Sequence, residues 1–358
     1  MRAPAFRRPI LKRTAALLGA MSLVLAACSG TAAPTTAPAS GPAETGGAPT
    51  AEPKTLEIAY LSFAVANSYD APMLAAAQAA AAAGNARVTV FDGNLDPAAQ
   101  TKQLQDAVAS GKFDGILLQP IFGAGLVADA TAAIAAGIAV GNIDQILGAD
   151  NTTADSQIEG LMTNVVFVPS ELGRKIGELV VQACAEKNAN PCNVGYIWSV
   201  KAAALDGTLK EAFDKATAVN PAIQIVAEGE SFYTTALGLK ASQDMLAAHP
   251  DISVIVSADQ AITGAVQAVA ALGLQDQVLL VGYGGGAIAF QGILAGERYG
   301  TVVQMPATEG RIGMEQLIKA IRSGVPFPGE DPLATLPDDG VATKANAATF
   351  LSLAEWPG

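Results

Sequence analysis

The chain has 358 residues, with 21 Lys plus Arg against 33 Asp plus Glu and a formal net charge of −12 at pH 7. An acidic surface repels phosphate groups, so this balance argues against nucleic acid or anionic lipid as a binding partner. The length is sufficient for two domains of ordinary size, each with its own hydrophobic core.

The first 27 residues resemble the signal peptide of a bacterial lipoprotein. Five basic residues precede an apolar run from Ala15 to Ala27, which is the order found in secretory signals. The segment Leu25-Ala26-Ala27-Cys28 is similar to the lipobox of such proteins. The resemblance implies cleavage before Cys28 and acylation of Cys28, and two or more acyl chains would make the anchor stable. The alternative is an ordinary secretory signal with a chance Cys.

Residues 28–54 are predicted to be a flexible tether, because Ala, Pro, Thr, Ser and Gly dominate and offer little apolar surface to bury. Loss of residues 1–27 would leave 16 Lys plus Arg against 33 acidic residues, a formal charge of −17. The prediction is an extracytoplasmic protein, lipid-anchored to the outer face of the cytoplasmic membrane.

From residue 55 the sequence alternates short apolar strands with helices. Strands are predicted at 56–61, 87–91, 115–118, 138–143, 164–168, 193–198, 223–227, 254–257 and 277–281. Helices are predicted at 71–83, 97–109, 126–136, 172–186, 209–218, 235–248 and 261–272. This alternation is typical of parallel strands joined by right-handed helical crossovers. Because the rhythm restarts after residue 168, we expect an α/β fold with two Rossmann-like lobes and a ligand cleft at the strand ends.

The predicted strand ends carry a family resemblance. It rests on the segments Asn67-Ser68-Tyr69, Ile116 to Pro120, Ala136 to Asp144, His249 to Asp259, and Thr301 to Pro306. Their order and spacing over nearly all of residues 55–350 resemble the solute-binding proteins of ABC sugar importers of the ribose- and galactose-binding type. The ordered set carries this resemblance, since no single motif is specific enough.

The resemblance implies a type I periplasmic-binding-protein architecture with three hinge crossings, near 168–169, 304–305 and 336–340. One lobe would comprise residues 55–168 plus 305–336, and the other 169–304 plus 337–358. The implied function is capture of a small polyhydroxylated solute, a monosaccharide or sugar alcohol, by closure of the cleft and delivery to an ABC permease. The protein would act as a monomer without a cofactor.

Carried over by position, the resemblance makes Asn67, Asp144, Asp259 and Gln304 hydrogen-bonding groups, with Tyr69 and Tyr233 as aromatic walls. These residue types suit a sugar, which has apolar C–H faces and a rim of hydroxyl groups. Carboxylates also form the stronger, charge-assisted hydrogen bonds. Two alternatives stay open: Asp144 and Asp259 as helix N-caps, and the two tyrosines as core or hinge packing.

The chain departs from the family where a ligand-gripping Arg, a binding Asn and a second Arg are common, because it has Gly207, Lys240 and Gln145 there. An unmodified ribose or galactose site is therefore not expected. Lys240 is included among the candidate ligand contacts, with a solvated helix residue as its alternative. We predict a neutral polyhydroxylated solute, with a sugar acid or a nucleoside as the alternatives.

Gly282 to Ala287 formally fits the glycine fingerprint of dinucleotide sites. The segment lies late in the chain, and no acidic residue ends a strand about 20 positions further on, as ribose recognition requires. The sequence instead predicts a flexible turn that faces the cleft.

Cys184 and Cys192 are predicted to form a local structural disulfide, because an exported protein leaves the reducing cytoplasm. Metal binding lacks partners, since the chain has one His, His249. No nucleophile with an adjacent base is evident, so the sequence predicts a binding protein and not an enzyme.

Two other functions share this fold. A sensory protein would present its ligand to a membrane receptor instead of a permease. A transcriptional regulator of the lactose-repressor type would need an N-terminal helix-turn-helix, and this chain has a lipobox and a low-complexity segment there.

Overall fold

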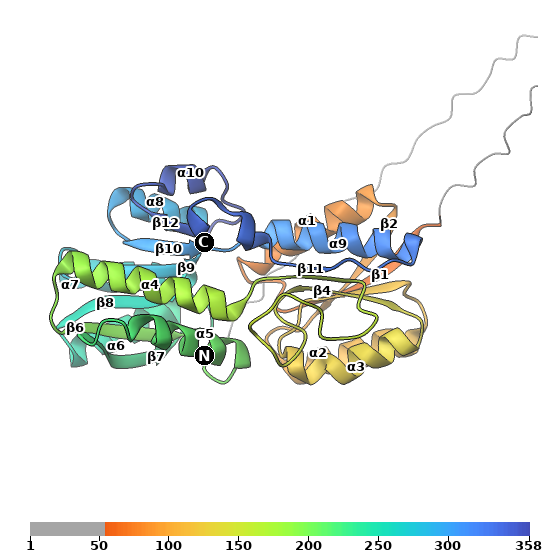
Figure 1. Ribbon diagram of the computed structural model, residues 1–358, viewed down its shortest axis with the longest axis horizontal. Helices are drawn as coiled ribbons and strands as arrows, with labels where there is room; N and C mark the ends of the chain where they lie inside the picture. The colour runs from red at the N-terminus through yellow and green to blue at the C-terminus, as the bar shows by residue number, and fades with distance from the viewer. Residues whose placement is uncertain (1–53) are drawn as a thin grey trace, which may run out of the picture. The chain divides into compact units, whose positions relative to one another are not determined.

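The computed structural model describes residues 54–358, which contain two six-stranded sheets (Figure 1). The predicted signal peptide, Cys28 and all of the tether except Lys54 lie outside the described residues. Both sheets belong to one unit that extends to Gly358. We call each sheet, together with the helices that cover it, a lobe.

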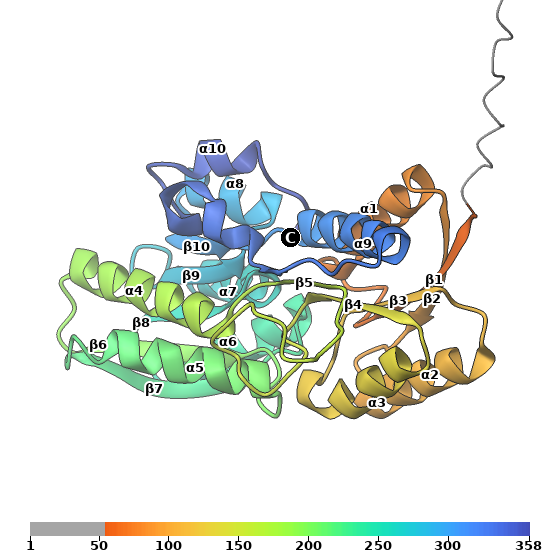
Figure 2. The same ribbon diagram turned by 45° about the vertical axis from the view of Figure 1, so that its right-hand side comes forward.

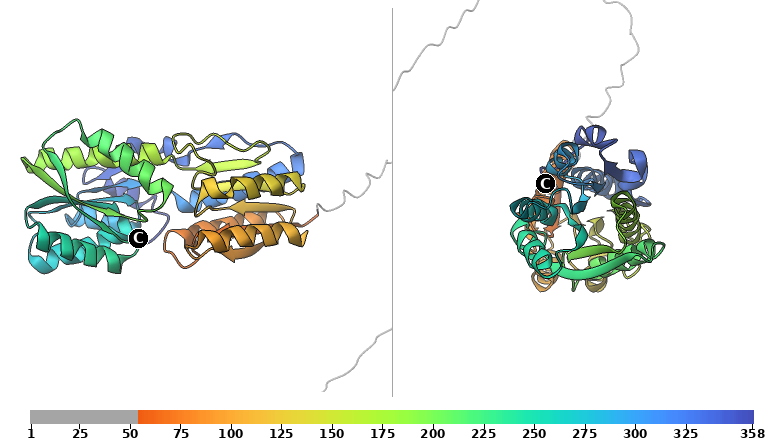
Figure 3. Two further views of the ribbon diagram at one scale, coloured as in Figure 1. Left: turned by 90° about the horizontal axis from the view of Figure 1, so that it is seen from below. Right: turned by 90° about the vertical axis from the view of Figure 1, so that its left-hand side faces the viewer.

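The first lobe is built on a parallel sheet of strand order β11-β5-β4-β3-β1-β2. Its strands are β1 (Leu56–Ser62), β2 (Ala86–Asp92), β3 (Gly115–Leu118), β4 (Ala139–Asp144), β5 (Thr163–Val166) and β11 (Gly329–Glu330). Its helices are α1 (Asp70–Ala83), α2 (Pro97–Ser110), α3 (Gly123–Ala135) and α9 (Pro306–Ser323). Helices α1 and α9 cover one face of the sheet, and α2 and α3 cover the other (Figures 1 and 3).

Strand β1 shows why this sheet is covered on both sides. Ile58 and Tyr60 belong to the core beneath α1 and α9, whereas Ala59 and Leu61 belong to the core beneath α2 and α3. All four are completely buried. A strand whose alternate side chains are apolar on both faces gains stability only when helices shield both faces from water.

The second lobe has the strand order β12-β10-β9-β8-β6-β7, in which only β12 is antiparallel to its neighbour. Its strands are β6 (Cys192–Trp198), β7 (Ile223–Glu230), β8 (Ile252–Ala258), β9 (Leu279–Gly284), β10 (Gly300–Val303) and β12 (Val341–Thr343). Its helices are α4 (Pro169–Lys187), α5 (Ala204–Thr217), α6 (Thr235–Ala248), α7 (Asp259–Leu272), α8 (Ala287–Ala295) and α10 (Ala347–Leu351).

The helices of the second lobe cover its sheet in pairs. Helices α4 and α5 pack together over one core cluster, and α6 and α7 pack together over another. Helices α8 and α10 lie side by side over the edge formed by β10 and β12, where Phe290 stacks on Phe350 (Figure 2). Each sheet is therefore the middle layer of a three-layer arrangement.

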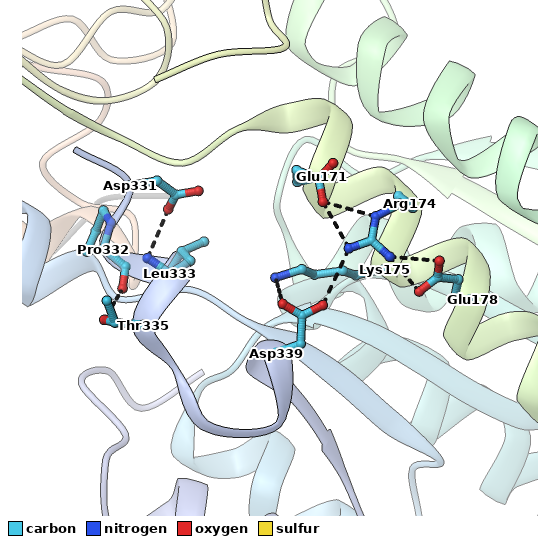
Figure 4. A network of polar contacts seen from close by, with 9 residues as sticks. All are labelled: Glu171, Arg174, Lys175, Glu178, Asp331, Pro332, Leu333, Thr335 and Asp339. Carbon is cyan, nitrogen blue, oxygen red and sulfur yellow. Dashed lines mark hydrogen bonds and ion pairs between the residues drawn. The ribbon is translucent and has the colours of Figure 1, made fainter. Parts of the chain in front are cut away.

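The chain passes between the lobes at three places: between β5 and α4, between β10 and α9, and between β11 and β12. The third connection holds two short 3-10 helices, Pro332–Thr335 and Pro337–Gly340. Asp339 in this connection accepts from Lys175 of α4 at 2.9 Å and pairs with the neighbouring Arg174 at 3.4 Å (Figure 4). Ion pairs thus attach the third connection to the start of α4.

The two-lobed α/β fold predicted from the sequence is confirmed, and every predicted strand and helix has a counterpart. Several boundaries differ by up to three residues, and the largest difference is at α5, which begins at Ala204 and not at residue 209. Gly207 therefore lies in the first turn of α5. The prediction did not include α8, α9, α10 or the strands β10, β11 and β12. A disulfide joins Cys184 at the end of α4 to Cys192 at the start of β6.

Candidate ligand-binding site

A cavity lies where the carboxyl ends of the strands of both lobes meet. Its empty volume is about 500 Å³, including the part that is open to solvent. This volume is within the range of small-molecule sites.

Five of the seven residues predicted to contact a ligand line this cavity: Asn67, Tyr69, Asp144, Tyr233 and Gln304. They come from the ends of β1, β4, β7 and β10, and so from both lobes. Parallel strands bring their carboxyl ends to one edge of a sheet, which is why residues distant in the sequence meet here. The other two predicted residues, Asp259 and Lys240, lie elsewhere.

Asp144 is the central polar group contributed by the first lobe. Its side chain accepts from the Tyr69 hydroxyl at 3.3 Å and from Gln119 Nε2 at 3.1 Å. The same Gln119 amide donates to Asp70 at 2.6 Å, and its Oε1 accepts from the Phe63 N–H at 3.1 Å. Gln119 is completely buried, so it fixes two carboxyl groups at the cavity wall.

Burial alters the protonation of these carboxyl groups. It raises the pKa of Asp144 to about 7, although the hydrogen bonds from Gln119 and Tyr69 act in the opposite direction. Burial and the nearby charge of Asp144 also raise the pKa of Asp70 well above its usual range, and burial does the same for Glu309 on α9. A carboxyl group that titrates near neutral pH can both accept from and donate to a hydroxyl group.

Asn67 and Tyr69 lie in the turn that leads into α1. The Asn67 side-chain oxygen accepts from the Tyr69 N–H at 2.8 Å, and the Asn67 carbonyl accepts from the Ala71 N–H at 3.0 Å. These bonds hold the turn so that the Tyr69 ring lines the cavity and its hydroxyl reaches Asp144.

The second lobe supplies a wall of tyrosines. The hydroxyl of Tyr283 forms a short hydrogen bond with Ser199 and a further one with Tyr233. The Tyr233 ring meets Phe63 of the first lobe edge to face, with centroids 6.3 Å apart. Tyr233 itself has a φ of +54°, a conformation in which a non-glycine residue persists only where its surroundings hold it.

Asp259 is committed to the interior of the second lobe. Its carboxylate accepts from Arg298 at 3.0 Å, from the Gly285 N–H at 2.7 Å and from the Thr301 hydroxyl at 2.8 Å. It is 1% exposed and does not line the cavity. Asp259 is not the N-cap of α7 either, because Ala258 occupies that position and no side chain caps the helix.

Lys240 lies on the exposed surface of α6, where it pairs with Asp244 one turn further on at 2.5 Å. It lines a different surface hollow, beside β7. The family resemblance indicates that a ligand contact lies on this helix, but the sequence does not show which side of the helix faces the strand ends. Lys240 is therefore a solvated helix residue, which was the alternative to a ligand contact.

The cavity wall carries two acidic residues, Asp70 and Asp144, and no Lys or Arg. A negatively charged ligand would meet these carboxyl groups without a compensating cation. Among the residues that the structure describes, no group of three His, Cys, Asp or Glu is arranged to hold a metal ion.

Several lining residues were not predicted: Phe63, Asp70, Gln145, Phe167, Gln260, Tyr283 and Trp356. Gln145 was noted only as a departure from the family. Five of these residues lie in a predicted strand or within three residues of its end, so that signal could have found them. Trp356 had no such signal, because the C-terminal segment follows no predicted strand.

The fold and this inter-lobe cavity define a solute-binding protein of two α/β lobes. A model of the periplasmic binding protein domain matches residues 58–324, and the chain belongs to this family. The family binds solutes and is not enzymatic, in agreement with the prediction. No described helix is long and apolar enough to cross a membrane.

Among individual proteins, the chain is 28% identical over 237 residues to the D-allose-binding periplasmic protein of Escherichia coli, covering 63% of this chain and 71% of that protein. An ABC transporter solute-binding protein of Mycobacterium smegmatis with bound glycerol is similar in structure, with a TM-score of 0.71 and 23% identity over 85% of this chain and 100% of the other. A solute-binding protein of Actinobacillus succinogenes with bound D-allose gives 0.68 and 24%, covering 82% and 99%.

Proposed function

We propose that this protein captures a neutral polyhydroxylated solute, a monosaccharide or a sugar alcohol, outside the cytoplasm and delivers it to an ABC permease. The observation that carries the proposal is the composition of the cavity wall. Aromatic rings from both lobes surround carboxyl and amide groups, and no cation is present among the lining residues.

The wall matches the chemistry of a sugar or polyol. The rings of Tyr69 and Tyr233 offer surfaces to apolar C–H groups. Asp144 and Gln304 offer hydrogen-bonding groups to hydroxyls, and Asp144 can also donate when it carries its proton. Because Lys240 points elsewhere and Asp70 and Asp144 are acidic, a sugar acid suits the cavity less well than a neutral sugar.

The proteins that the chain resembles support the same solute class. Their names record binding of D-allose or bound glycerol, and a similar protein from Caulobacter is bound to myo-inositol, at 21% identity and a TM-score of 0.70 over 83% of this chain and 96% of the other. All of these are neutral polyhydroxylated molecules. We therefore favour this class over a nucleoside, without selecting one member.

Binding would act by closing the cleft. We take residues 55–168 plus 305–336 as one moving lobe and residues 169–304 plus 337–358 as the other. A solute held by Asp144 of the first lobe and Gln304 near the hinge gains the Tyr233 contact only when the lobes approach. Its binding free energy would then shift the equilibrium towards the closed form, which the permease would recognise.

Thermal unfolding of the purified protein tests the solute class. The panel would include D-allose, D-ribose, L-arabinose, myo-inositol and glycerol, with gluconate and adenosine representing the alternatives. A ligand present at a hundredfold its dissociation constant stabilises the folded protein by about 2.7 kcal/mol, which gives a clear rise in Tm. Stabilisation by gluconate or adenosine alone would contradict the proposal.

Two variants test the assignment of the site. Gln304→Ala removes a predicted hydrogen-bonding group from the cavity, and loss of one such bond costs about 0.5–1.5 kcal/mol, or about 2- to 13-fold in affinity. Lys240→Ala is the matched control, because it removes an exposed side chain outside the cavity. Calorimetry should show weaker binding only for Gln304→Ala. Equal weakening in both would refute the site.

We further propose that Cys28 carries the lipid anchor and residues 28–54 form the tether. The segment Leu25-Ala26-Ala27-Cys28 supports this assignment. In a bacterial host fed radiolabelled palmitate, the wild-type protein should become labelled and sediment with membranes. Cys28→Ala should abolish the label. Equal labelling of both proteins would contradict the proposal.

A further inference from the structure

The segment that follows α10 returns to the cavity and places Trp356 in its wall, and the C-terminal end lies beside the start of α9 (Figures 1 and 2). Trp356 is 3% exposed, and its indole N–H donates to the Gly284 carbonyl at the end of β9 at 3.1 Å. Its ring meets Tyr69 edge to face, with centroids 5.5 Å apart. Trp356 therefore contacts both lobes at the cavity.

Backbone and side-chain bonds hold this segment on both sides of Trp356. The carbonyl oxygens of Trp356 and Pro357 accept from the first N–H groups of α8, Ala287 at 2.9 Å and Ile288 at 2.8 Å. On the other side, the Glu355 carboxylate accepts from the Thr308 N–H at 2.9 Å and from the Thr308 hydroxyl. These N–H groups stand at the starts of two helices, where the helix itself supplies no acceptor. The C-terminal segment therefore provides their hydrogen-bond acceptors.

The glycine run that begins at the end of β9 leaves room for the indole ring. Gly284 has a φ of +129°, and a Cβ placed on it would lie 2.8 Å from Trp356 Cζ2. A Cβ on Gly286 would lie 2.5 Å from the Cα of Gly358. The sequence predicted a flexible turn here. In the structure the turn is the surface against which the C-terminal segment packs.

We propose that Trp356 is a specificity-determining residue, whose indole ring closes the cavity and limits it to solutes the size of one sugar ring or polyol. The inference rests on the proposed function, because it takes the cavity as the solute site. A flat aromatic face next to Tyr69 suits the apolar C–H face of a sugar ring. Fixed by Gly284, the ring also occupies space that a second sugar unit would need.

A fluorescence titration tests whether Trp356 faces the solute. The chain has two tryptophans, Trp198 and Trp356. In Trp198→Phe, Trp356 is the remaining indole, and its emission should change saturably when the full chain is titrated with D-allose, D-ribose or myo-inositol. In the matched variant Trp356→Phe, Trp198 remains beside Lys201 and Glu228 outside the cavity, and its emission should not change.

A selectivity measurement tests the size limit. Calorimetry would compare the wild type, Trp356→Ala and Trp198→Ala with the best monosaccharide or polyol of the panel and with the disaccharide maltose. We expect Trp356→Ala to bind the small solute at least tenfold more weakly, and its preference over maltose to fall at least tenfold. Trp198→Ala should keep the preference. If Trp356→Ala does not fold, Trp356→Phe, whose ring is smaller, replaces it in the comparison with maltose. A preference equal to that of the wild type would then refute the size limit.

The outcomes separate this inference from the proposed function. If the wild type binds a sugar or polyol but Trp356 emission is unchanged, and Trp356→Phe retains the wild-type affinity and selectivity, the role of Trp356 is refuted and the solute class stands. If no compound of the panel binds to the wild type, the proposed function fails and the inference fails with it.

Discussion

The guanidinium of Arg298 donates to the carboxylate of Asp259 at 3.0 Å, with side-chain exposures of 2% and 1%. The pair lies in the second lobe. Asp259 also accepts hydrogen bonds from the Gly285 N–H and the Thr301 hydroxyl, and Arg298 donates to the Thr263 hydroxyl at 2.7 Å. Asp259 therefore joins the start of α7 to β10 and to the two segments that flank α8, which is a structural role.

We predict that Asp259→Ala mainly lowers the free energy of unfolding, and that any effect on solute binding is secondary. It would leave the Arg298 charge buried without its partner, which costs about 3–5 kcal/mol of the free energy of unfolding. Urea unfolding measures this loss, and Asp244→Ala, which removes an exposed partner of Lys240, should cost less than about 1 kcal/mol. A variant of Asp259 with wild-type stability and lost solute binding would instead support its assignment as a ligand contact.

Asp144 should make stability depend on pH. Its pKa in the folded protein is raised from 3.8 to about 7, so the folded protein keeps a proton that the unfolded chain releases. This contribution is complete below about pH 4 and declines as pH rises to about 7. One pKa unit corresponds to about 1.4 kcal/mol, so the total is a few kcal/mol.

Asp144→Asn should therefore flatten the decline in the free energy of unfolding between pH 4 and 7. The substitution should not abolish the decline, because burial also raises the pKa of Asp206 to about 7 and raises the pKa of Asp70 well above its usual range. Urea unfolding at several pH values gives the profile, with Asp244→Asn as the exposed control. An unchanged slope in Asp144→Asn would contradict the assignment.

The ion pairs in Figure 4 should differ in their contribution to stability. The Lys175 side chain is 10% exposed, so loss of its partner in Asp339→Asn leaves a nearly buried ammonium group unpaired and should cost about 1–3 kcal/mol. Asn tolerates the positive φ of Asp339, so the backbone conformation is kept. Arg174→Ala, at an exposed position in the same network, should cost less than about 1 kcal/mol. Equal losses would refute this distinction.

The disulfide between Cys184 and Cys192 should contribute to stability but not to binding. It closes a short loop, with a sequence separation of 8, for which the chain-entropy relation gives about 2–3 kcal/mol. Cys184→Ala with Cys192→Ala should lower Tm and leave solute affinity unchanged, since Cys192 begins β6 and the cavity lies at the other strand ends. Treatment of the wild type with a reductant is the control and should lower Tm similarly.

The two-lobed α/β fold was predictable because its causes are local. Short apolar runs such as Gly115–Leu118 indicate strands, and the spacing of apolar residues between such runs indicates helices. The right-handed preference of crossover connections then restricts how parallel strands are joined. The elements after residue 284 were harder to predict. Helix α8 is hydrophobic on most sides, and the strands β10, β11 and β12 have only two to four residues.

By itself, the sequence determined the order of strands and helices as far as residue 281 and the strand-end positions of Tyr69 and Asp144, and its family resemblance indicated Gln304. It also predicts the export and lipidation signals. The tertiary structure alone decided that Lys240 faces solvent, that Asp259 is neutralised by Arg298, and that Trp356 reaches the cavity. These outcomes depend on which side of a helix or strand faces a neighbour and on contacts between distant segments. Local sequence patterns do not contain that information, because it arises only when the elements pack together.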